Sequence, residues 1–215
     1  MANARHVQRL YDHKASGYDA ATSSQMLDAL RSGLFARASG DVLELGVGTG
    51  ATFAHYPATL RSLTALDVSG EMLRRAQPRT LRLPFPVRLV QHDFQTLPFP
   101  AASFDTVTSS LGLCGIPDPA RLFSEVRRVL RPGGQLLALE HVRPPNAWLG
   151  IAADGLDPLF ERFVGCHANR RTPHLLREAG FTVEVLERRL AGILVALRAT
   201  RPGPREVPAS RSARS

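Results

Sequence analysis

The pattern of apolar and polar positions predicts strands that alternate with helices along most of the chain. Five short apolar runs are typical of buried strands. They occupy residues 42–45, 63–66, 87–90, 104–108 and 135–142. Apolar residues at helical spacing lie between strands at 70–77 and 119–130. Such alternation at short spacing predicts parallel βαβ units, with ligands bound outside the carboxyl ends of the strands.

Both ends of the chain depart from this alternation. Two strands are expected near the C-terminus, at residues 181–187 and 192–198, after a helix at 173–179. So short a link permits only antiparallel pairing, because parallel strands need a crossover of a dozen or more residues. Residues 6–18 and 26–35 predict two helices before the first strand, and a serine can cap the second one.

We therefore expect one domain over residues 1–200. Residues 1–39 should form a helical lid, and residues 143–172 an insertion at the ligand edge. A chain of 215 residues with 44% hydrophobic and 21% charged residues is ordinary for one well-buried core. The basic segment 201–215 is rich in proline, serine and arginine, so it is predicted to be a disordered tail.

A glycine-rich turn follows the first predicted strand, in the sequence DVLELGVGTG. Gly46, Gly48 and Gly50 permit a positive φ and let a ligand approach the backbone closely. A helix is expected at residues 52–56, and its first N–H groups should face the ligand. The spacing also fits the dinucleotide fingerprint, so the turn alone leaves the ligand open.

Acidic residues end two of the predicted strands. Asp67 lies twenty-one residues after Gly46, where a carboxylate can accept hydrogen bonds from a ribose diol. Asp93 ends the third strand beside Phe94. A carboxylate next to an aromatic ring suits the amino group and the face of an adenine. The two acids together predict a site for an adenine nucleoside.

The formal charge of +8 raises the question of a nucleic-acid partner. Lys14 is the only lysine, all other basic side chains except histidine are arginine, and several of these lie in the tail. That usage is more typical of compositional bias than of a binding patch, so no nucleic-acid partner is expected. The sequence contains no apolar run of about 20 residues and no signal-peptide core, so we expect a cytoplasmic protein without an integral membrane segment.

The two cysteines, Cys114 and Cys166, are far apart in the sequence, and neither belongs to a C-x-x-C motif. The spacing predicts neither a metal site nor a disulfide. A buried structural thiol is the expected role of each.

Taken in order, the motifs LELGVGTG, ALDVSGEML, QHDFQTLPFPAASFDTVTSS and EVRRVLRPGG resemble those of the class I S-adenosylmethionine-dependent methyltransferases, in the type 11 group. The resemblance implies a three-layer Rossmann-like α/β fold whose seven-stranded, mostly parallel sheet has its last strand antiparallel. It also implies S-adenosyl-L-methionine as cofactor. The cofactor-binding residues that it implies are Glu44, Gly46, Gly48, Gly50, Asp67, Met72, Asp93, Phe94 and Ser109.

A narrower resemblance connects the chain to the methyltransferase-like thiol S-methyltransferases. It rests on LELGVGTGATFAHYP, LGLCGIPD and RVLRPGGQLLALEHV, and on later residues that include Trp148, Cys166 and Arg170. The animal members of that group carry an N-terminal apolar anchor, which this sequence lacks. The resemblance implies a small-molecule acceptor, with a thiol as the first class to test.

The chemistry of methyl transfer sets modest demands on the protein. The donor is already activated, so alignment of the acceptor can supply much of the rate. His141 follows the fifth strand and is the expected base, while Tyr18, Trp148 and His167 are expected to contact the acceptor. No metal is expected.

Other functions compete with this interpretation. An O-, N- or C-methyltransferase of a quinone, lipid or secondary metabolite would share the cofactor motifs, and a non-catalytic S-adenosylmethionine-binding regulatory module would also share them. An NAD-dependent oxidoreductase is disfavoured, because Glu44 would repel a pyrophosphate and the terminal strand pair does not suit that fold. We expect a monomer or a homodimer.

Overall fold

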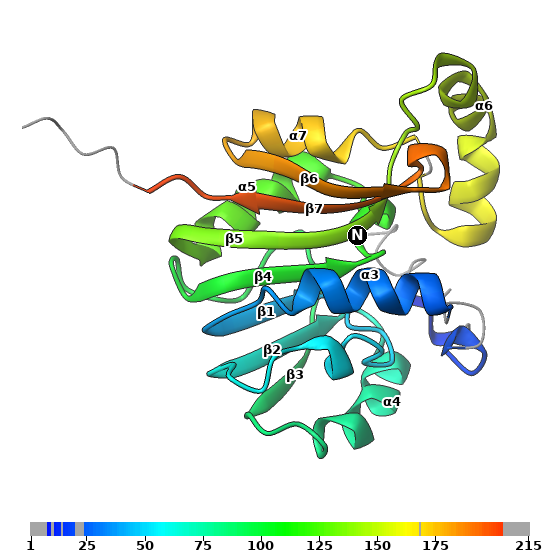
Figure 1. Cartoon of the computed structure of the whole chain (residues 1–215). Helices are drawn as coiled ribbons and strands as arrows, with labels where there is room; N and C mark the ends of the chain where they lie inside the picture. The colour runs from blue at the N-terminus through cyan, green and yellow to red at the C-terminus, as the bar shows by residue number, and fades with distance from the viewer. Residues whose placement is uncertain (1–7, 10, 14, 20–23, 168, 204–215) are drawn as a thin grey trace, which may run out of the picture.

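The computed structural model describes residues 8–9, 11–13, 15–19, 24–167 and 169–203. Its seven strands form one sheet in the order β3-β2-β1-β4-β5-β7-β6 (Figure 1). Their bounds are β1 Asp41–Leu45, β2 Ser62–Asp67, β3 Val87–Gln91, β4 Phe104–Ser110, β5 Leu130–His141, β6 Thr182–Arg189 and β7 Leu194–Thr200. Only β7 runs against its neighbours β5 and β6, which confirms the predicted antiparallel end of the sheet.

Five helices with bounds inside the described residues cover the two faces and one end of this sheet. They are α3 Gln25–Phe35, α4 Gly70–Thr80, α5 Pro119–Val129, α6 Ala147–Val164 and α7 Thr172–Glu178. Ser24, Ser69 and Asp118 cap α3, α4 and α5, because each side chain accepts a hydrogen bond from a backbone N–H of the first turn. These three helices therefore form where apolar residues at helical spacing follow a capping residue.

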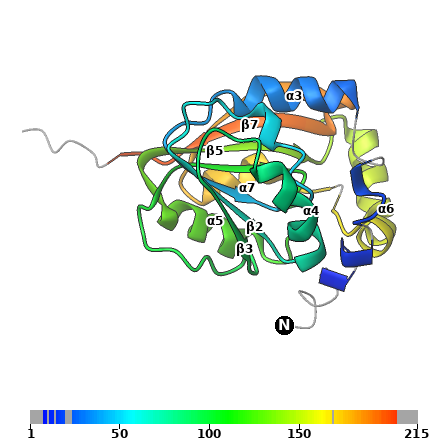
Figure 2. The same cartoon turned by 90° about the horizontal axis from the view of Figure 1, so that it is seen from below.

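The core consists of one apolar layer on each face of the sheet. The layer under α5 and α7 contains Leu122, Phe123 and Leu176, and the layer under α3 and α4 contains Leu34 and Phe35. Figure 2 shows α3 and α5 on opposite sides of the strands. The two layers fix the strands, so the loops at the strand ends are held by a rigid base.

The carboxyl ends of the parallel strands meet at one edge of the sheet. Leu45 of β1 pairs with Leu66 of β2 and with Ser109 of β4, and Ser110 pairs with Leu139 of β5. Helix α6 lies beyond this edge, away from the layered helices (Figure 1). The predicted insertion at the ligand edge is thus mainly one helix. Among the described helices, none has both the length and the hydropathy needed to cross a membrane.

Three local predictions were wrong or only partly tested. The helix expected after the glycine turn is a single 3-10 turn, η1 Phe53–His55, because Gly50 has a φ of +79° and Pro57 stops the chain from continuing as a helix. Arg201 does not begin a disordered tail, since its backbone pairs with Gly133 and Gly134. Residues 204–215 and parts of the predicted helix at 6–18 lie outside the described residues.

Candidate active site

The glycine turn follows β1 and is hydrogen-bonded to the neighbouring strand β2. The N–H groups of Gly46 and Val47 donate to Leu66 O at 2.9 and 3.1 Å, which ties the turn to β2. Gly46 has a φ of +72°, and a Cβ on it would lie 3.5 Å from Gly112 Cα and 3.6 Å from the Phe94 ring. A side chain there would therefore fill the space between the turn and Phe94.

Asp67 joins the turn to the end of β2. Its Oδ2 accepts the Gly48 N–H at 2.8 Å, and its Oδ1 accepts the Ser69 N–H at 2.9 Å. Burial raises the pKa of Asp67 to about 6, despite these hydrogen bonds. Each carboxylate oxygen has a second lone pair, so Asp67 can still accept a hydrogen bond from a ligand.

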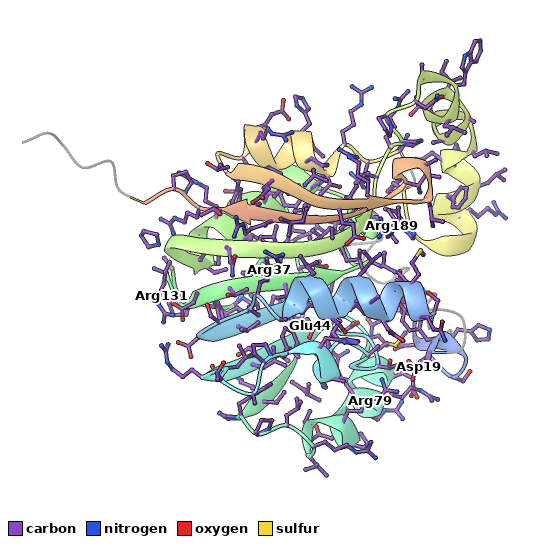
Figure 3. All side chains as sticks on the ribbon, viewed as in Figure 1. Asp19, Arg37, Glu44, Arg79, Arg131 and Arg189 are labelled. Atoms are coloured by element: carbon purple, nitrogen blue, oxygen red, sulfur yellow. The ribbon has the colours of Figure 1, made fainter. Side chains whose placement is uncertain are left out.

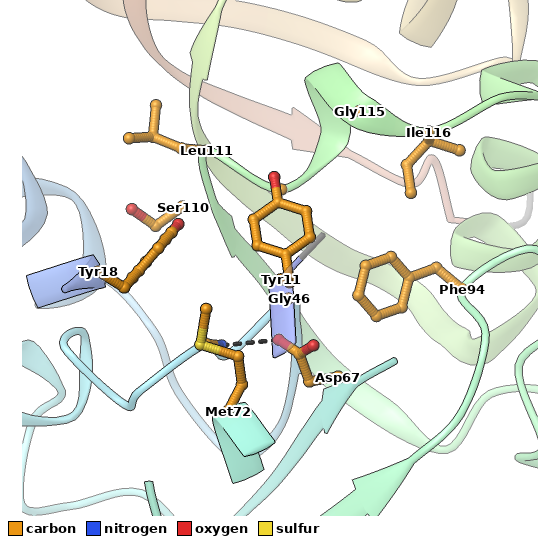
Figure 4. Close-up of a pocket in the computed structure, with 12 residues that line it drawn as sticks. Tyr11, Tyr18, Gly46, Asp67, Met72, Phe94, Ser110, Leu111, Gly115 and Ile116 are labelled. Atoms are coloured by element: carbon orange, nitrogen blue, oxygen red, sulfur yellow. Dashed lines mark hydrogen bonds between the residues drawn. The ribbon is translucent and has the colours of Figure 1, made fainter. Parts of the chain in front are cut away.

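A cavity, here called the glycine-turn cavity, opens above these residues (Figure 4). Its lining includes Gly46, Gly48, Asp67, Met72, Phe94 and Ser110. The free space is about 50 Å³, whereas small-molecule pockets usually hold roughly 300 Å³ or more. A nucleoside can enter only if part of the lining moves.

The described residues of the N-terminal segment form one side of the glycine-turn cavity. Tyr11 and Tyr18 line the glycine-turn cavity, with their rings edge to face and the centroids 6.2 Å apart (Figure 4). Asp12 accepts a hydrogen bond from Ser69 Oγ at 2.5 Å, and Asp19 pairs with Arg79 at 2.5 Å (Figure 3). Polar contacts therefore hold this segment over the cavity.

A buried carboxylate orders the loop after β4. Glu140 is fully buried in β5, and its Oε1 accepts the N–H groups of Gly112 and Leu113, each at 3.0 Å. Its Oε2 accepts the Cys114 N–H at 3.2 Å. Burial raises the pKa of Glu140 to about 7. Gly112 and Gly115 line the glycine-turn cavity. Glu140 therefore holds the loop that forms one wall of this cavity, although its own side chain is not part of the lining.

A second cavity, here called the α6 cavity, lies on the other side of that loop. Its volume is about 280 Å³, and it is almost entirely apolar. The lining residues are His141, Pro144, Leu149, Ala152, Ala153, Leu156, Phe160, Cys166 and Ile193. The two cavities are neighbours, because a Cβ on Gly115 would lie 2.5 Å from Gly165 O, one residue before Cys166.

Two cysteines and a histidine meet between the cavities. The ligand atoms of Cys114, His141 and Cys166 lie within 4.8 Å of one another, and His141 Nδ1 is 3.8 Å from Cys166 Sγ. Hydrogen bonding with Cys114 and with His141 lowers the pKa of Cys166, and the contact with Cys166 raises the pKa of His141. The sequence spacing missed this cluster, because its members come from three separate elements.

Six of the predicted cofactor and acceptor residues line the glycine-turn cavity. They are Tyr18, Gly46, Gly48, Asp67, Met72 and Phe94. Four of the predicted cofactor residues are absent from this lining. Glu44 is buried beside Thr52, whose Oγ1 donates to its Oε1 at 2.5 Å, Gly50 packs on Phe53, and Asp93 accepts the Gln95 N–H at 3.0 Å.

Ser109, the fourth residue, is also absent from this lining. Its Oγ donates to Glu140 Oε1 at 3.3 Å, whereas the next residue, Ser110, lines the cavity. The strand β4 continues through Ser110, and successive side chains of a strand point to opposite faces. The sequence prediction ended this strand too early to show which serine faces the ligand.

The predicted base and two of the predicted acceptor contacts lie in three different places. His141, the predicted base, lines the α6 cavity. Trp148 is 81% exposed and lies outside the lining of both cavities, because it sits on the outer face of α6. His167 lines a separate polar groove, and its Nδ1 lies 2.8 Å from Asp157 Oδ2. The structure does not bring these three side chains together.

Sequence reasoning also missed residues that shape the site. Arg31 is 4% exposed in α3, and its Nε donates to Ser110 Oγ at 3.2 Å beside the glycine-turn cavity. Glu140 stood in the motif LEHV, but a buried acid within an apolar strand was not used as a signal. A charged residue at a position that the strand or helix pattern buries is the cue that would have found both.

Comparisons with known proteins agree with this arrangement. Residues 43–138 match the family described as "Methyltransferase domain". The chain is 36% identical over 132 residues to a phosphatidylethanolamine N-methyltransferase of Cereibacter sphaeroides, and 35% identical over 158 residues to the thiol S-methyltransferase TMT1B of Homo sapiens. These alignments cover 60% and 70% of the chain. The chain spans only 64% of the length of either relative.

A third relative is covered more fully. The ubiquinone/menaquinone biosynthesis C-methyltransferase UbiE of Pseudomonas fluorescens is 30% identical over 190 residues, which are 77% of this chain and 74% of that protein. The fold matches the crystal structure of an S-adenosylmethionine-dependent methyltransferase from Mesorhizobium loti with a TM-score of 0.63 at 22% identity, over 81% of this chain and 96% of that one. The chain thus belongs to the S-adenosylmethionine-dependent methyltransferases, and its cofactor is S-adenosylmethionine.

Proposed function

We propose that the protein transfers a methyl group from S-adenosylmethionine to the sulfur of a small apolar thiol. The observation that carries the proposal is the α6 cavity, an apolar space of about 280 Å³ whose polar groups are His141 and Cys166. It lies beside the glycine-turn cavity, so an acceptor there is close to the donor. The similarity to thiol S-methyltransferase TMT1B supports a sulfur acceptor.

The residues that line the glycine-turn cavity have the chemistry that the cofactor requires. Asp67 has free lone pairs for the ribose hydroxyls, and Phe94 and Met72 offer apolar surface for the adenine. Gly46 leaves the space that a Cβ would fill, so the methionine part can pass close to the backbone. When bound, the cofactor supplies a methyl group on a sulfonium, which needs no further activation.

In this proposal Glu44 affects cofactor binding indirectly, because it holds the conformation of the glycine turn. It is fully buried under α3 (Figure 3), and burial raises its pKa to about 7 against the hydrogen bonds from Thr52 and Tyr56. Its contact with Thr52 fixes the chain just after Gly50. The carboxylate therefore holds the shape of the turn from the side that faces the core.

Tyr11 and Tyr18 would act as a lid over the cofactor. Their rings occupy the mouth of a cavity that is too small for a nucleoside as it stands. A hydrogen bond from Ser69 to Asp12 and an ion pair between Asp19 and Arg79 join their segment to the domain. A partly exposed ion pair such as the second contributes little stability. The segment can then open for the cofactor and close again at low cost.

His141 suits a thiol acceptor better than a hydroxyl. Its pKa is raised by the contact with Cys166, so the imidazole takes up a positive charge more readily than usual. A cationic ring stabilises a thiolate, which forms near a pKa of about 8.5 in a free thiol. A phenol with a pKa near 10 needs more help to ionise at neutral pH than a thiol does.

A methyltransferase acting on carbon or nitrogen is the second candidate. The apolar lining of the α6 cavity would also receive a quinone ring or an acyl chain, and UbiE and the phosphatidylethanolamine N-methyltransferase are among the relatives. The oxidoreductase and the regulatory module have less support. A pyrophosphate needs the N-terminus of a helix, and the glycine turn leads only to the 3-10 turn η1.

One panel experiment tests these alternatives. The purified protein is incubated with cofactor labelled in its methyl group and with apolar thiols, phenols, amines and a reduced quinone, and the products are separated by mass. We expect labelled thioethers. Labelled quinone or amine without labelled thioether would overturn the thiol acceptor and leave the family assignment standing.

A further inference from the structure

Cys114, His141 and Cys166 come from three elements that fold toward one point. Cys114 lies in η2 Leu113–Gly115, His141 ends β5, and Cys166 follows α6. Cys114 and Cys166 are 3% and 6% exposed, and His141 is half-buried. Two thiols and one imidazole gathered at a buried point form a donor set of the kind that binds a soft divalent ion.

The spacing of the donor atoms fits a tetrahedral ion. All three lie within 4.8 Å of one another, and the Cys166 Sγ to His141 Nδ1 distance is 3.8 Å. Around Zn²⁺, with Zn–S of about 2.3 Å and Zn–N of about 2.0 Å, ligand atoms lie roughly 3.5–3.8 Å apart. Movements below roughly 1 Å would therefore close the three side chains onto one ion.

The backbone around the cluster is already fixed. The Cys114 N–H donates to Glu140 Oε2 at 3.2 Å, and the Cys114 carbonyl accepts the His167 N–H at 3.1 Å. The second contact joins the chain after Cys166 to the loop that carries Cys114. Ligands held by such outer contacts lose little freedom when they bind a metal, and the outer partners usually tune metal affinity.

We propose that Cys114, His141 and Cys166 bind one Zn²⁺ ion and leave its fourth position open to the α6 cavity. Three protein ligands with one open position are the arrangement of catalytic zinc. His141 and Cys166 both line the α6 cavity, so that position faces the acceptor. In this arrangement His141 serves as a ligand instead of a base.

The open position gives a thiol acceptor a way to ionise, and this part rests on the proposed function. A thiol that binds there loses its proton to solvent and stays bound as the thiolate. Its sulfur then forms a bond to the methyl carbon while the bond from that carbon to the sulfonium breaks. The products are the methyl thioether and neutral S-adenosylhomocysteine.

Cobalt substitution tests the site without any turnover. The reduced full-length protein, freed of metal and kept anaerobic, is titrated with Co²⁺. We expect one equivalent to bind, with thiolate-to-cobalt absorption in the near ultraviolet and tetrahedral bands in the visible, and Zn²⁺ should displace it. Cys114→Ser, Cys166→Ser and His141→Ala should each weaken binding by about tenfold or more. His174→Ala changes an exposed histidine that pairs with Glu178 and should bind Co²⁺ normally.

Each other outcome has a defined meaning. Absence of cobalt absorption in a folded protein that binds S-adenosylhomocysteine overturns the metal site, as does unchanged absorption in Cys166→Ser. A Cys114–Cys166 disulfide, detected by thiol counting before reduction and restored by air, also overturns it if the reduced protein binds no Co²⁺. Cobalt binding without methylation of any thiol keeps the metal site and overturns the thiol acceptor.

Discussion

The backbone N–H of Gly48 donates to Asp67 Oδ2 at 2.8 Å, so one carboxylate joins the glycine turn to the end of the neighbouring strand. The same carboxylate faces the glycine-turn cavity (Figure 4). A ligand bound to Asp67 therefore also contacts a group that fixes the shape of the turn. This dual position makes Asp67 the most informative residue to change.

Asp67→Ala should weaken binding of S-adenosylhomocysteine by on the order of 2 kcal/mol, because charge-assisted hydrogen bonds to the ribose are lost. Calorimetry measures the effect. Asp93→Ala is the matched control, since Asp93 also follows a strand but lies outside the cavity lining and caps a turn at Gln95. Equal losses in the two variants would mean that Asp67 has no special part in binding.

Gly46→Val should abolish cofactor binding, because the new side chain would occupy the space between the turn and Phe94. Positive φ adds strain to any such change, so Gly133→Val is the control. Gly133 has a φ of +79°, and a Cβ on it would meet nothing within 4 Å. Gly133→Val should therefore lower the melting temperature through backbone strain and leave cofactor affinity unchanged. Normal affinity in folded Gly46→Val would place the ligand elsewhere.

Leu156→Ala should raise the KM for the acceptor by several-fold and leave cofactor affinity unchanged. Leu156 lines the α6 cavity. Leu159 is the control on the same helix: it is 53% exposed against 48% for Leu156, but it is outside the lining. Steady-state kinetics with both substrates varied separates the two constants. A similar rise in KM for Leu159→Ala would show a general effect of α6.

The protein without cofactor should become more stable as pH falls from about 8 to about 6. Burial raises the pKa of Glu44 and Glu140 to about 7 and that of Asp67 to about 6. The folded state then binds protons that the unfolded state releases, so stability is fully present below the ordinary carboxyl pKa and is lost as pH rises through 6 to 7. Thermal melts across pH test this sign. A melting temperature that rises with pH over this range would contradict it.

Cofactor affinity should decrease as pH falls, whereas stability should increase. A protonated Asp67 is a weaker acceptor for ribose hydroxyls, so binding of S-adenosylhomocysteine should weaken as pH falls through about 6, the pKa of Asp67. Calorimetry at matched ionic strength gives the profile. In Asp67→Asn this step should be absent, and its persistence there would assign the titration to another group.

Much of the fold could be predicted from periodicity, because strands and helices here follow buried apolar patterns. The site was harder. Asp67 and Gly46, which line the glycine-turn cavity, could be proposed because a strand-end acid and a glycine turn have local signals. Ser110 was missed by one position of strand register, and the cluster of Cys114 and Cys166 was missed because only tertiary structure joins an element at residue 114 to one at residue 166.

Helix α6 contributes to only one of the two cavities. It lies beyond the sheet (Figure 1), and it supplies five of the side chains that line the α6 cavity but none that line the glycine-turn cavity. Under the proposed function, substitutions along α6 therefore change which acceptor is taken while the lining of the cofactor cavity stays the same.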